Sequence, residues 1–586
     1  MRTVWHSLAA VFLLGGTAFG FDTIHLDASL NDSTRTITGK MQVTFTSIEQ
    51  PVDDLRFRLY PNLFCGAREC GISVDSFFVG TNDLTDRVVS DSTDLHVGLP
   101  QPLNSPIDVA IYFKTVVPEL AGRFGYFDRQ YALETWFPMP APLAYGRWQK
   151  VHYTNEVEPV ADFYDFVVNF EFPDSLQIIA PGMVSADTTD GTISAHFEQA
   201  DVHEFAMIVG KDYLADTLQS GSISLRVYYR EADAFMADSV MKVADTTLKL
   251  MSQYVVAYPY NEYNVVIGGF VGGGLEVPLG TFLNRPTRVV WFSFYDLMVA
   301  HETIHQWFYG IINSSQAATP WLDESITEYF SWKVLADVVG DPVEMTSLAG
   351  YEITFTGVNR FAARQYIGLL PITEPADYYF PDEYFVTIYY KGVLLMRTFG
   401  ALMGPENERL FWKTYGDMYQ MRRPTTDEFI ELASQFMPPP TDAGEVINMA
   451  QPLDFEMRSI KREVIDTLEL DTTETGGPTE SGPRMRSTVS FMARHPLKAP
   501  VTVRLIFQDD VKHDTTIVPK PGRNEIVVEG SEPVLGAVID PDYVYAVDAN
   551  LLNNALYPDV SSGAGLRLFE GLSYLVELLF GMAWGI

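Results

Sequence analysis

Four residues in the middle of the chain have the types and spacing needed to bind a metal ion and hydrolyse a bond. His301 and His305 enclose Glu302 in the segment His-Glu-Thr-Ile-His, and Glu324 follows the second histidine by nineteen positions. Residues four apart lie on one face of an α-helix, so both imidazoles can point at one ion. A catalytic zinc takes three protein ligands and leaves one position for water. The spacing predicts one Zn²⁺ held by His301, His305 and Glu324, with Glu302 as the base that activates the zinc-bound water for attack on a carbonyl.

Two helices must present these side chains. Residues 295–308 contain no Gly or Pro and carry apolar residues at three-to-four spacing, which predicts a helix that ends near Gly310. Residues 323–334 predict a second helix, which carries Glu324 and for which Asp323 is a candidate cap.

Both segments continue in a way that resembles one family. "HETIHQWFYG" and "WLDESITEYF" are similar to the HExxH motif and the later glutamate segment of the M1 zinc aminopeptidases, which belong to the gluzincin clan. The resemblance implies a mostly helical, thermolysin-like catalytic domain, one zinc ion per chain and the removal of residues from peptide N-termini.

A glycine-rich segment upstream also resembles this family. "GGFVGGGLEVP" is similar to the GxMEN exopeptidase motif and places Glu276 at its glutamate, with Leu275 and Val277 in place of Met and Asn. The resemblance implies that Glu276 pairs with the free α-ammonium of the substrate, a charge that only a chain terminus carries. Gly273 and Gly274 would let the substrate backbone come close to a strand edge.

A third segment, "TIYYKGVLL", resembles the family's YxKG motif. It places Tyr389 at the tyrosine whose phenol would donate a hydrogen bond to the oxyanion of the tetrahedral intermediate. Tyr390 is the neighbour with which it could be confused, and Lys391 and Gly392 set the register. Family members also offer a Gln or Glu from the N-terminal domain to the substrate amine. Gln130 and Glu134 are both candidates, and the sequence does not choose between them.

Changes of pattern along the chain indicate an α+β multidomain protein. Short alternating stretches predict strands at both ends, and long Leu/Met/Ala-rich segments without breakers predict helices between them. We expect a signal peptide at 1–20, an N-terminal β-rich domain at 21–230, the zinc catalytic domain at 231–453, a small C-terminal β-sandwich at 454–550 with a flexible loop at 467–487, and an apolar, helical tail at 551–586.

Composition favours an exported protein that does not bind nucleic acid. The formal charge of −36 opposes binding to phosphate backbones. Arg2, a short apolar run and small residues before Phe21 predict secretion to the periplasm or the outside of the cell, with an N-terminal membrane anchor as the alternative. In an oxidising compartment, Cys65 and Cys70 could form a disulfide. The apolar tail is expected to dock on the protein's own body, with membrane contact as the lesser alternative.

These observations lead to one functional hypothesis and two alternatives. We expect an exported zinc aminopeptidase that acts on peptides with a free N-terminus, with Glu302 and Tyr389 as its catalytic residues. The alternatives are a zinc endopeptidase of the same clan and a non-catalytic, zinc-stabilised binding protein on a similar frame. The preferred N-terminal residue, the physiological substrate and the oligomeric state are not encoded in any pattern that we recognise.

Overall fold

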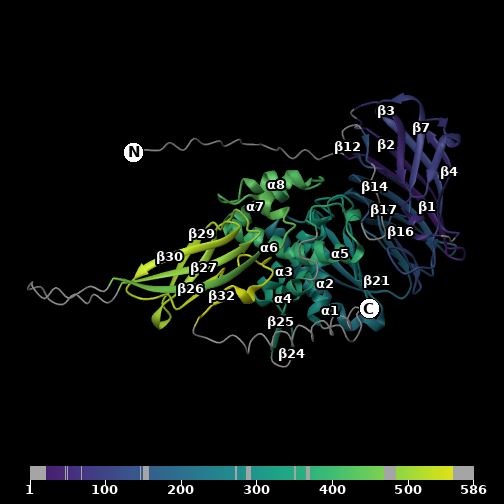
Figure 1. The fold of residues 1–586 in the computed structure, drawn as a ribbon. Coiled ribbons are helices and arrows are strands. Elements are labelled where there is room, and N and C mark those ends of the chain that lie inside the picture. The colour runs from purple at the N-terminus through teal and green to yellow at the C-terminus, as the bar shows by residue number, and fades with distance from the viewer. Residues whose placement is uncertain are drawn as a thin grey trace, which may run out of the picture.

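The computed structural model describes residues 21–46, 48, 50–66, 69–144, 147–149, 158–270, 273–285, 292–348, 351–364, 370–466 and 484–558. The predicted signal peptide, residues 467–483 of the predicted loop and residues 559–586 of the predicted tail lie outside this part. Figure 1 shows the three regions in chain order, with N-terminal strands, a central body of helices, and C-terminal strands beyond it. The mixed α+β architecture expected from the sequence is confirmed.

The N-terminal region is built around one large sheet of eight strands, in the order β16-β17-β14-β1-β2-β8-β4-β5. β8 (Ile107–Val116) and β14 (Tyr164–Pro173) in its middle alternate between buried apolar and outward-facing residues, as in a sheet that covers a core with one face. They are β1 (Thr23–Asn31), β2 (Thr36–Phe45), β4 (Gly71–Val79), β5 (Asn82–Asp83), β8 (Ile107–Val116), β14 (Tyr164–Pro173), β16 (Met183–Thr189) and β17 (Thr192–Val202).

Two four-stranded sheets and a short hairpin complete this region. One sheet contains β9 (Phe124–Phe127), β10 (Gln130–Leu133), β15 (Gln177–Ile179) and β18 (Met207–Gly210). The other contains β3 (Val52–Arg58), β6 (Val88–Asp91), β7 (Asp94–Leu103) and β11 (Met139–Pro140), and the hairpin is β12 (Leu143–Ala144) with β13 (Arg147–Trp148). Cys65 and Cys70, which lie between β3 and β4 in the chain, form a disulfide.

The central region contains a five-stranded sheet, in the order β19-β20-β21-β23-β22, that lies against the helices. Its strands are β19 (Leu214–Ser220), β20 (Ile223–Tyr229), β21 (Glu262–Phe270), β22 (Gly274–Val277) and β23 (Gly280–Asn284). The expected boundary at residue 230 is therefore too late, because β19 and β20 pair with the sheet that carries Glu276. Period-2 alternation had assigned them to the preceding β-rich region.

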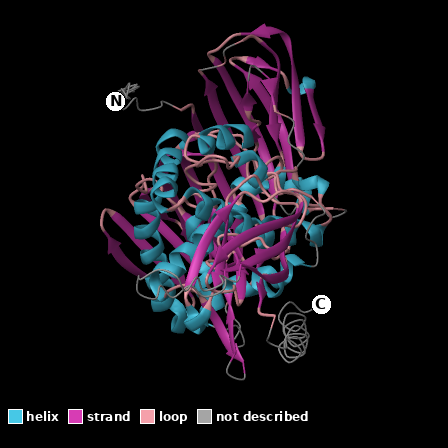
Figure 2. Cartoon of the chain, turned by 60° about the vertical axis from the view of Figure 1, so that its left-hand side comes forward, coloured by secondary structure: helices cyan, strands magenta, loops and turns pink. Residues whose placement is uncertain are grey.

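The helices of the central region lie together in one body (Figure 2). They are α1 (Ala234–Tyr254), α2 (Phe292–Ile304), α3 (Glu324–Val339), α4 (Phe355–Arg364), α5 (Pro381–Phe385), a π-helix (Val386–Lys391), α6 (Gly392–Met403), α7 (Pro405–Tyr419), α8 (Thr426–Ser434) and α9 (Ala443–Ile447), with a hairpin of β24 (Glu344–Leu348) and β25 (Tyr351–Thr354). Among the described residues, no helix has both the length and the apolar character to cross a membrane.

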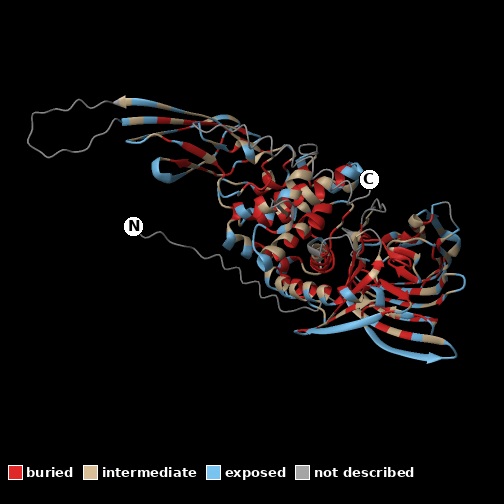
Figure 3. Cartoon of the chain, turned by 90° about the horizontal axis from the view of Figure 1, so that it is seen from below, coloured by how far each residue is buried: buried red, intermediate tan, exposed pale blue. Residues whose placement is uncertain are grey.

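The C-terminal strands form two sheets, which share one hydrophobic core with the central helices. The strands are β26 (Asp454–Asp466), β27 (Arg484–Arg494) and β30 (Gly522–Gly530) in one sheet, and β28 (Val501–Ile506), β29 (Lys512–Ile517), β31 (Gly536–Ile539) and β32 (Ala555–Leu556) in the other. Two expectations need correction: residues 484–487, placed in the flexible loop, begin β27, and residues 555–556, placed in the helical tail, pair with β31. Figure 3 shows buried residues concentrated in the middle of the helical body and on the N-terminal strands.

A smaller apolar cluster joins the N-terminal region to the five-stranded sheet. Ala132 and Ile208 come from β10 and β18, and they pack with Val266, Leu275 and Phe282 of the central sheet. Strand β22, which carries Glu276, is thus fixed from both regions.

Candidate metal centre and active site

The two histidines lie at the end of α2, which stops earlier than predicted. His301 is in its last turn, and His305 follows the final helical residue, Ile304. After Ile304, backbone hydrogen bonds join residues three apart in the sequence instead of four. Examples are Gln306 N to Thr303 O (3.2 Å) and Trp307 N to Ile304 O (2.8 Å). The sequence of residues 305–308 lacks any breaker, so the tightening of the chain here was not visible in its pattern.

The three predicted ligands converge. His301 Nε2 and His305 Nε2 are 3.0 Å apart, and Glu324 Oε2 lies 3.4 Å from each of them. Ligand distances of about 2.0–2.1 Å in a tetrahedral site place ligand atoms about 3.3 Å from one another. The three side chains therefore fit one zinc ion: His301 is in the last turn of α2, His305 directly follows that helix, and Glu324 begins α3.

Charge supports the same fit. Burial disfavours a charged His305, yet Glu276, Glu324 and Asp323 raise its pKa well above the ordinary value. Burial likewise opposes ionisation of Glu324, but His305 and His301 outweigh it and hold its pKa well below the usual range. The site thus favours positive charge between an ionised carboxylate and two imidazoles, which a divalent cation provides.

Further carboxylates orient the imidazole rings from behind. Asp323 Oδ1 lies 2.8 Å from His305 Nδ1, and Glu328 Oε1 lies 3.2 Å from His301 Nδ1. The Asp323 contact is a hydrogen bond, and such a partner fixes the tautomer of His305 and aims its Nε2 at a metal. Glu328 lies at ion-pair distance from His301. Asp323, the candidate cap of α3, does not fill that role: its side chain makes no capping bond, and instead it accepts from Ser314 Oγ and lies 2.8 Å from His305 Nδ1.

Glu302 is buried against the start of β22. A Cβ atom added at Gly274 would lie 2.2–2.4 Å from side-chain atoms of Glu302, so a larger residue there would displace the Glu302 side chain. Burial raises the pKa of Glu302 to about 7, with His301 and His305 opposing that rise and Glu324 adding to it. A base with a pKa near neutrality is suited to proton transfer at physiological pH.

Glu276 lies on β22, close to His305. Its Oε1 is 3.9 Å from His305 Nδ1, and the residue is 5% exposed. Burial, followed by the charge of Glu158, raises the pKa of Glu276 well above its ordinary value. Gly273, immediately before the strand, has a φ of +148°, a conformation that favours glycine.

Tyr389 lies on the π-helix and its ring stacks on His301, with centroids 6.2 Å apart. Burial and the nearby Glu324 raise its pKa well above the ordinary value, so the phenol keeps its proton and can donate it in a hydrogen bond. Lys391 anchors the π-helix through bonds from Nζ to Leu370 O (2.7 Å) and Ala450 O (3.3 Å). Irregular helical turns of this kind often occur at functional sites.

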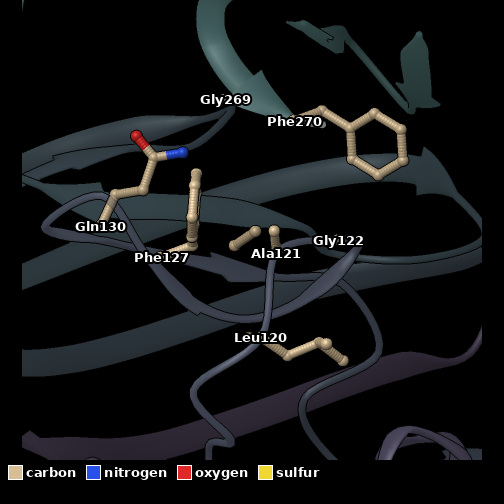
Figure 4. A pocket seen from close by; sticks show the side chains of 9 residues that line it. Leu120, Ala121, Gly122, Phe127, Gln130, Gly269 and Phe270 are labelled. Atoms are coloured by element: carbon tan, nitrogen blue, oxygen red, sulfur yellow. The ribbon is translucent and has the colours of Figure 1, made fainter. Parts of the chain in front are cut away.

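Gln130 and Glu134, the two N-terminal candidates for contact with the substrate amine, have different surroundings in the structure. The Gln130 amide donates to Gly268 O (3.0 Å), and its oxygen accepts from Arg230 Nη2 (2.9 Å). Figure 4 shows Gln130 and Phe270 among the residues that line a small pocket, which includes none of the metal-site residues. Glu134 is fully buried, 3.4 Å from Arg123 Nη1. Glu134 interacts electrostatically with Glu158, which in turn acts on Glu276.

Several residues at the site carried no recognisable signal in the sequence. Glu158 adds negative potential at both Glu276 and Glu302, Gln316 donates to Glu324 Oε1 (3.0 Å), and Tyr384 packs its ring on Tyr389 with centroids 6.3 Å apart. These residues come from loops and from a short helix without periodicity. Only Glu328, four residues after Glu324, could have been found from helical spacing.

Two histidines at the end of one helix and a glutamate at the start of the next, with a buried glutamate between the histidines, define the class of mononuclear zinc metallopeptidases. Within that class, residues 240–449 match the model of the peptidase family M1 domain. The chain therefore carries an M1 peptidase domain.

Known relatives agree with this assignment. Leucine aminopeptidase 2 of Aspergillus niger is 24% identical over 322 residues, which make up 52% of this chain and 51% of the relative. Leucine aminopeptidase 2 of Chaetomium globosum is 23% identical over 398 residues, 64% of each protein. The chain thus spans 51% and 64% of the length of these two relatives.

Solved structures show a shared fold. The M1 zinc metallopeptidase from Deinococcus radiodurans superposes with a TM-score of 0.54 at 17% identity, over 73% of this chain and 92% of the other. A two-domain M1 zinc metallopeptidase mutant bound to L-arginine has the same TM-score of 0.54 at 16% identity and covers 74% of this chain.

Proposed function

We propose that this chain is an exported, zinc-dependent aminopeptidase that hydrolyses the N-terminal bond of peptides. The observation that carries the proposal is Glu276, a buried carboxylate next to the triad whose Oε1 has no hydrogen-bond partner among the described residues. A buried carboxylate in this state gains strongly from a cationic ligand. The α-ammonium of a peptide is such a ligand, and the name of the fungal relatives, leucine aminopeptidase 2, supports the same activity.

The reaction divides among the residues of the site. His301, His305 and Glu324 would hold Zn²⁺, which polarises the carbonyl and lowers the pKa of water. Glu302 would take a proton from the attacking water and deliver it to the leaving amine. Tyr389 would donate its phenolic hydrogen to the oxyanion, and Glu276 would hold the ammonium so that only the first peptide bond reaches the site.

The substrate backbone has an available binding edge. Strand β22 is the last strand of its sheet, so it pairs with β23 on one side only. An extended peptide can add to such an edge through main-chain hydrogen bonds. Gly273 and Gly274 lack side chains that would block the approach.

Export is part of the proposal and rests on separate observations. The first twenty residues have the composition of a secretory signal. The Cys65–Cys70 disulfide supports an oxidising compartment. Expression of the full chain in a secreting host, followed by N-terminal sequencing of the exported product, should give a mature start at Phe21; retention of Met1 on an uncleaved product would contradict it.

A paired substrate panel tests the activity. Aminoacyl fluorophores would be offered with a free amine and as their N-acetylated twins, each with and without a zinc chelator. We expect cleavage of the free-amine substrates alone, lost on chelation, and the panel would reveal the preferred first residue. Equal cleavage of acetylated twins would remove Glu276 from its role and favour an endopeptidase, and zinc binding without cleavage would favour a binding protein.

A further inference from the structure

Gln316 connects the metal site to the N-terminal region. It lies in the loop between α2 and α3 and is 2% exposed. Both ends of its amide are used: Nε2 donates to Glu324 Oε1 at 3.0 Å, and Oε1 accepts from the backbone N–H of Glu158 at 3.0 Å. A buried amide with both ends bonded has one orientation, so the direction of its donor is fixed.

This contact divides the two oxygens of Glu324 between two tasks. Oε1 accepts from Gln316, whereas Oε2 lies 3.4 Å from the Nε2 atoms of His301 and His305. A carboxylate that is free to rotate can offer either oxygen, or both, to a metal. The amide of Gln316 restricts Glu324 to presenting Oε2 between the two imidazoles.

The other end of the connection is equally constrained. Glu158 accepts from Arg123 through two short bonds, from Nη1 at 2.6 Å and from Nη2 at 2.7 Å. Such a bidentate pair fixes both position and orientation. Arg123 immediately precedes β9, and Glu158 lies shortly before β14, so both belong to the N-terminal region.

We propose that Gln316 is a positioning residue for Glu324, through which the N-terminal region sets the affinity of the site for zinc. The inference rests on the proposed zinc site but adds a role for a residue outside its ligands and motifs. An amide suits this position because it donates a hydrogen bond without adding a second negative charge beside Glu324. Partners of this kind typically change metal affinity 10- to 100-fold when removed.

The test measures zinc affinity of the full chain by competition with a chromophoric chelator. Gln316→Met removes the donor but keeps the side-chain volume, and we expect about 10- to 100-fold weaker zinc binding. Gln316→Glu keeps the shape and replaces the donor with a charge that repels Glu324, so it should weaken binding at least as much. The isosteric variant keeps the test valid if the methionine variant fails to fold.

Gln130→Met is the matched control. Gln130 is also a buried glutamine, at 3% exposure, and it also joins the N-terminal region to the central sheet, through Gly268. It contacts no metal ligand in the described residues, so its replacement should leave zinc affinity within about threefold of the wild type.

A second readout separates positioning from general destabilisation. With Co²⁺ in place of Zn²⁺, the visible absorption reports ligand geometry, and we expect it to change in both Gln316 variants and not in Gln130→Met. Wild-type zinc affinity retained in folded Gln316→Glu would overturn the inference. Failure of the wild-type protein to bind zinc would instead overturn the proposed metal site itself.

Discussion

Glu324 and Glu276 are both buried carboxylates close to His305, yet their environments shift their pKa values in opposite directions. The two imidazoles hold the pKa of Glu324 well below its ordinary value, whereas burial and the neighbouring Glu158 raise that of Glu276 well above. Glu324 is thus ionised and suited to bind a metal ion together with the two histidines beside it. Glu276 Oε1 has no hydrogen-bond partner among the described residues, so it can accept a bond from a cationic ligand. The difference is consistent with the roles proposed above, in which Glu324 binds the metal and Glu276 binds the substrate ammonium.

The largest effect is expected from Glu302, the proposed general base, which interacts electrostatically with both carboxylates. Glu302→Gln removes the proton acceptor, and kcat should fall about 10²- to 10⁴-fold. Zinc content should stay at one per chain, because Glu302 is not among the ligands. Metal analysis and kinetics on the same preparation check this, with the exposed Glu431→Gln as control. Full activity in Glu302→Gln would contradict its role.

Replacing Glu276 should weaken recognition of the substrate amine and leave zinc binding unchanged. Glu276→Gln removes a charge-assisted bond to the α-ammonium, and kcat/KM for free-amine substrates should fall about 10- to 100-fold, the equivalent of a charged hydrogen bond. Zinc affinity should be unchanged. The discrimination between free and acetylated substrates should shrink by the same factor, and undiminished discrimination would place amine recognition elsewhere.

Packing around the metal side should show in stability. A Cβ at Gly392 would lie 2.2 Å from Ser325 Oγ, which is next to Glu324 and donates to Ile388 O (2.6 Å). Gly392→Ala should therefore lower the free energy of unfolding by about 1–3 kcal/mol. Chemical denaturation measures it, with Gly98→Ala, which meets no atom within 4 Å, as control. Equal stability of the two variants would contradict the close packing.

The smallest effect concerns a buried histidine of the N-terminal region. Burial lowers the pKa of His203 to about 3, and its Nε2 lies 3.1 Å from Tyr309 O. The unfolded chain binds this proton near pH 6.5 and the folded protein does not, so stability is lost as pH falls below 6.5. From pH 6.5 to 5.0 the loss should be about 1.6 kcal/mol.

His203→Gln removes this term, because glutamine can donate to the same carbonyl but does not titrate. The difference in unfolding free energy between pH 6.5 and 5.0 should therefore be smaller in the variant than in the wild type. The same pH dependence in both proteins would assign the acid sensitivity to other groups.

The parts of the site that sequence could predict are those encoded at short range. His301 and His305 are one helical turn apart, and Glu324 and Tyr389 stand in segments with recognisable neighbours. The mixed α+β fold also followed from local periodicity. What failed locally was the end of α2 and the role of Asp323, because tertiary contacts with His305 and Ser314 replaced the local capping bond.

The rest of the site depends on contacts that no local pattern contains. Glu158 and Gln316 are 158 positions apart in the chain and meet through one hydrogen bond. The choice between Gln130 and Glu134 likewise depended on Arg230 and Gly268, which lie about a hundred or more positions away. Polar residues in loops look alike in a sequence, and only their partners give them a role.

The core that the central helices share with the C-terminal strands bears on how such a protein can evolve. Arg360 on α4 donates to Ala546 O (3.0 Å), and Thr398 on α6 accepts from Val547 N (3.2 Å), within that continuous core. A descendant that lost the C-terminal strands in one deletion would expose apolar surface over both helices. Gain or loss of this region therefore requires many coordinated substitutions in the helices that it packs on. By contrast, single substitutions along the edge of β22 can change which ligand binds there.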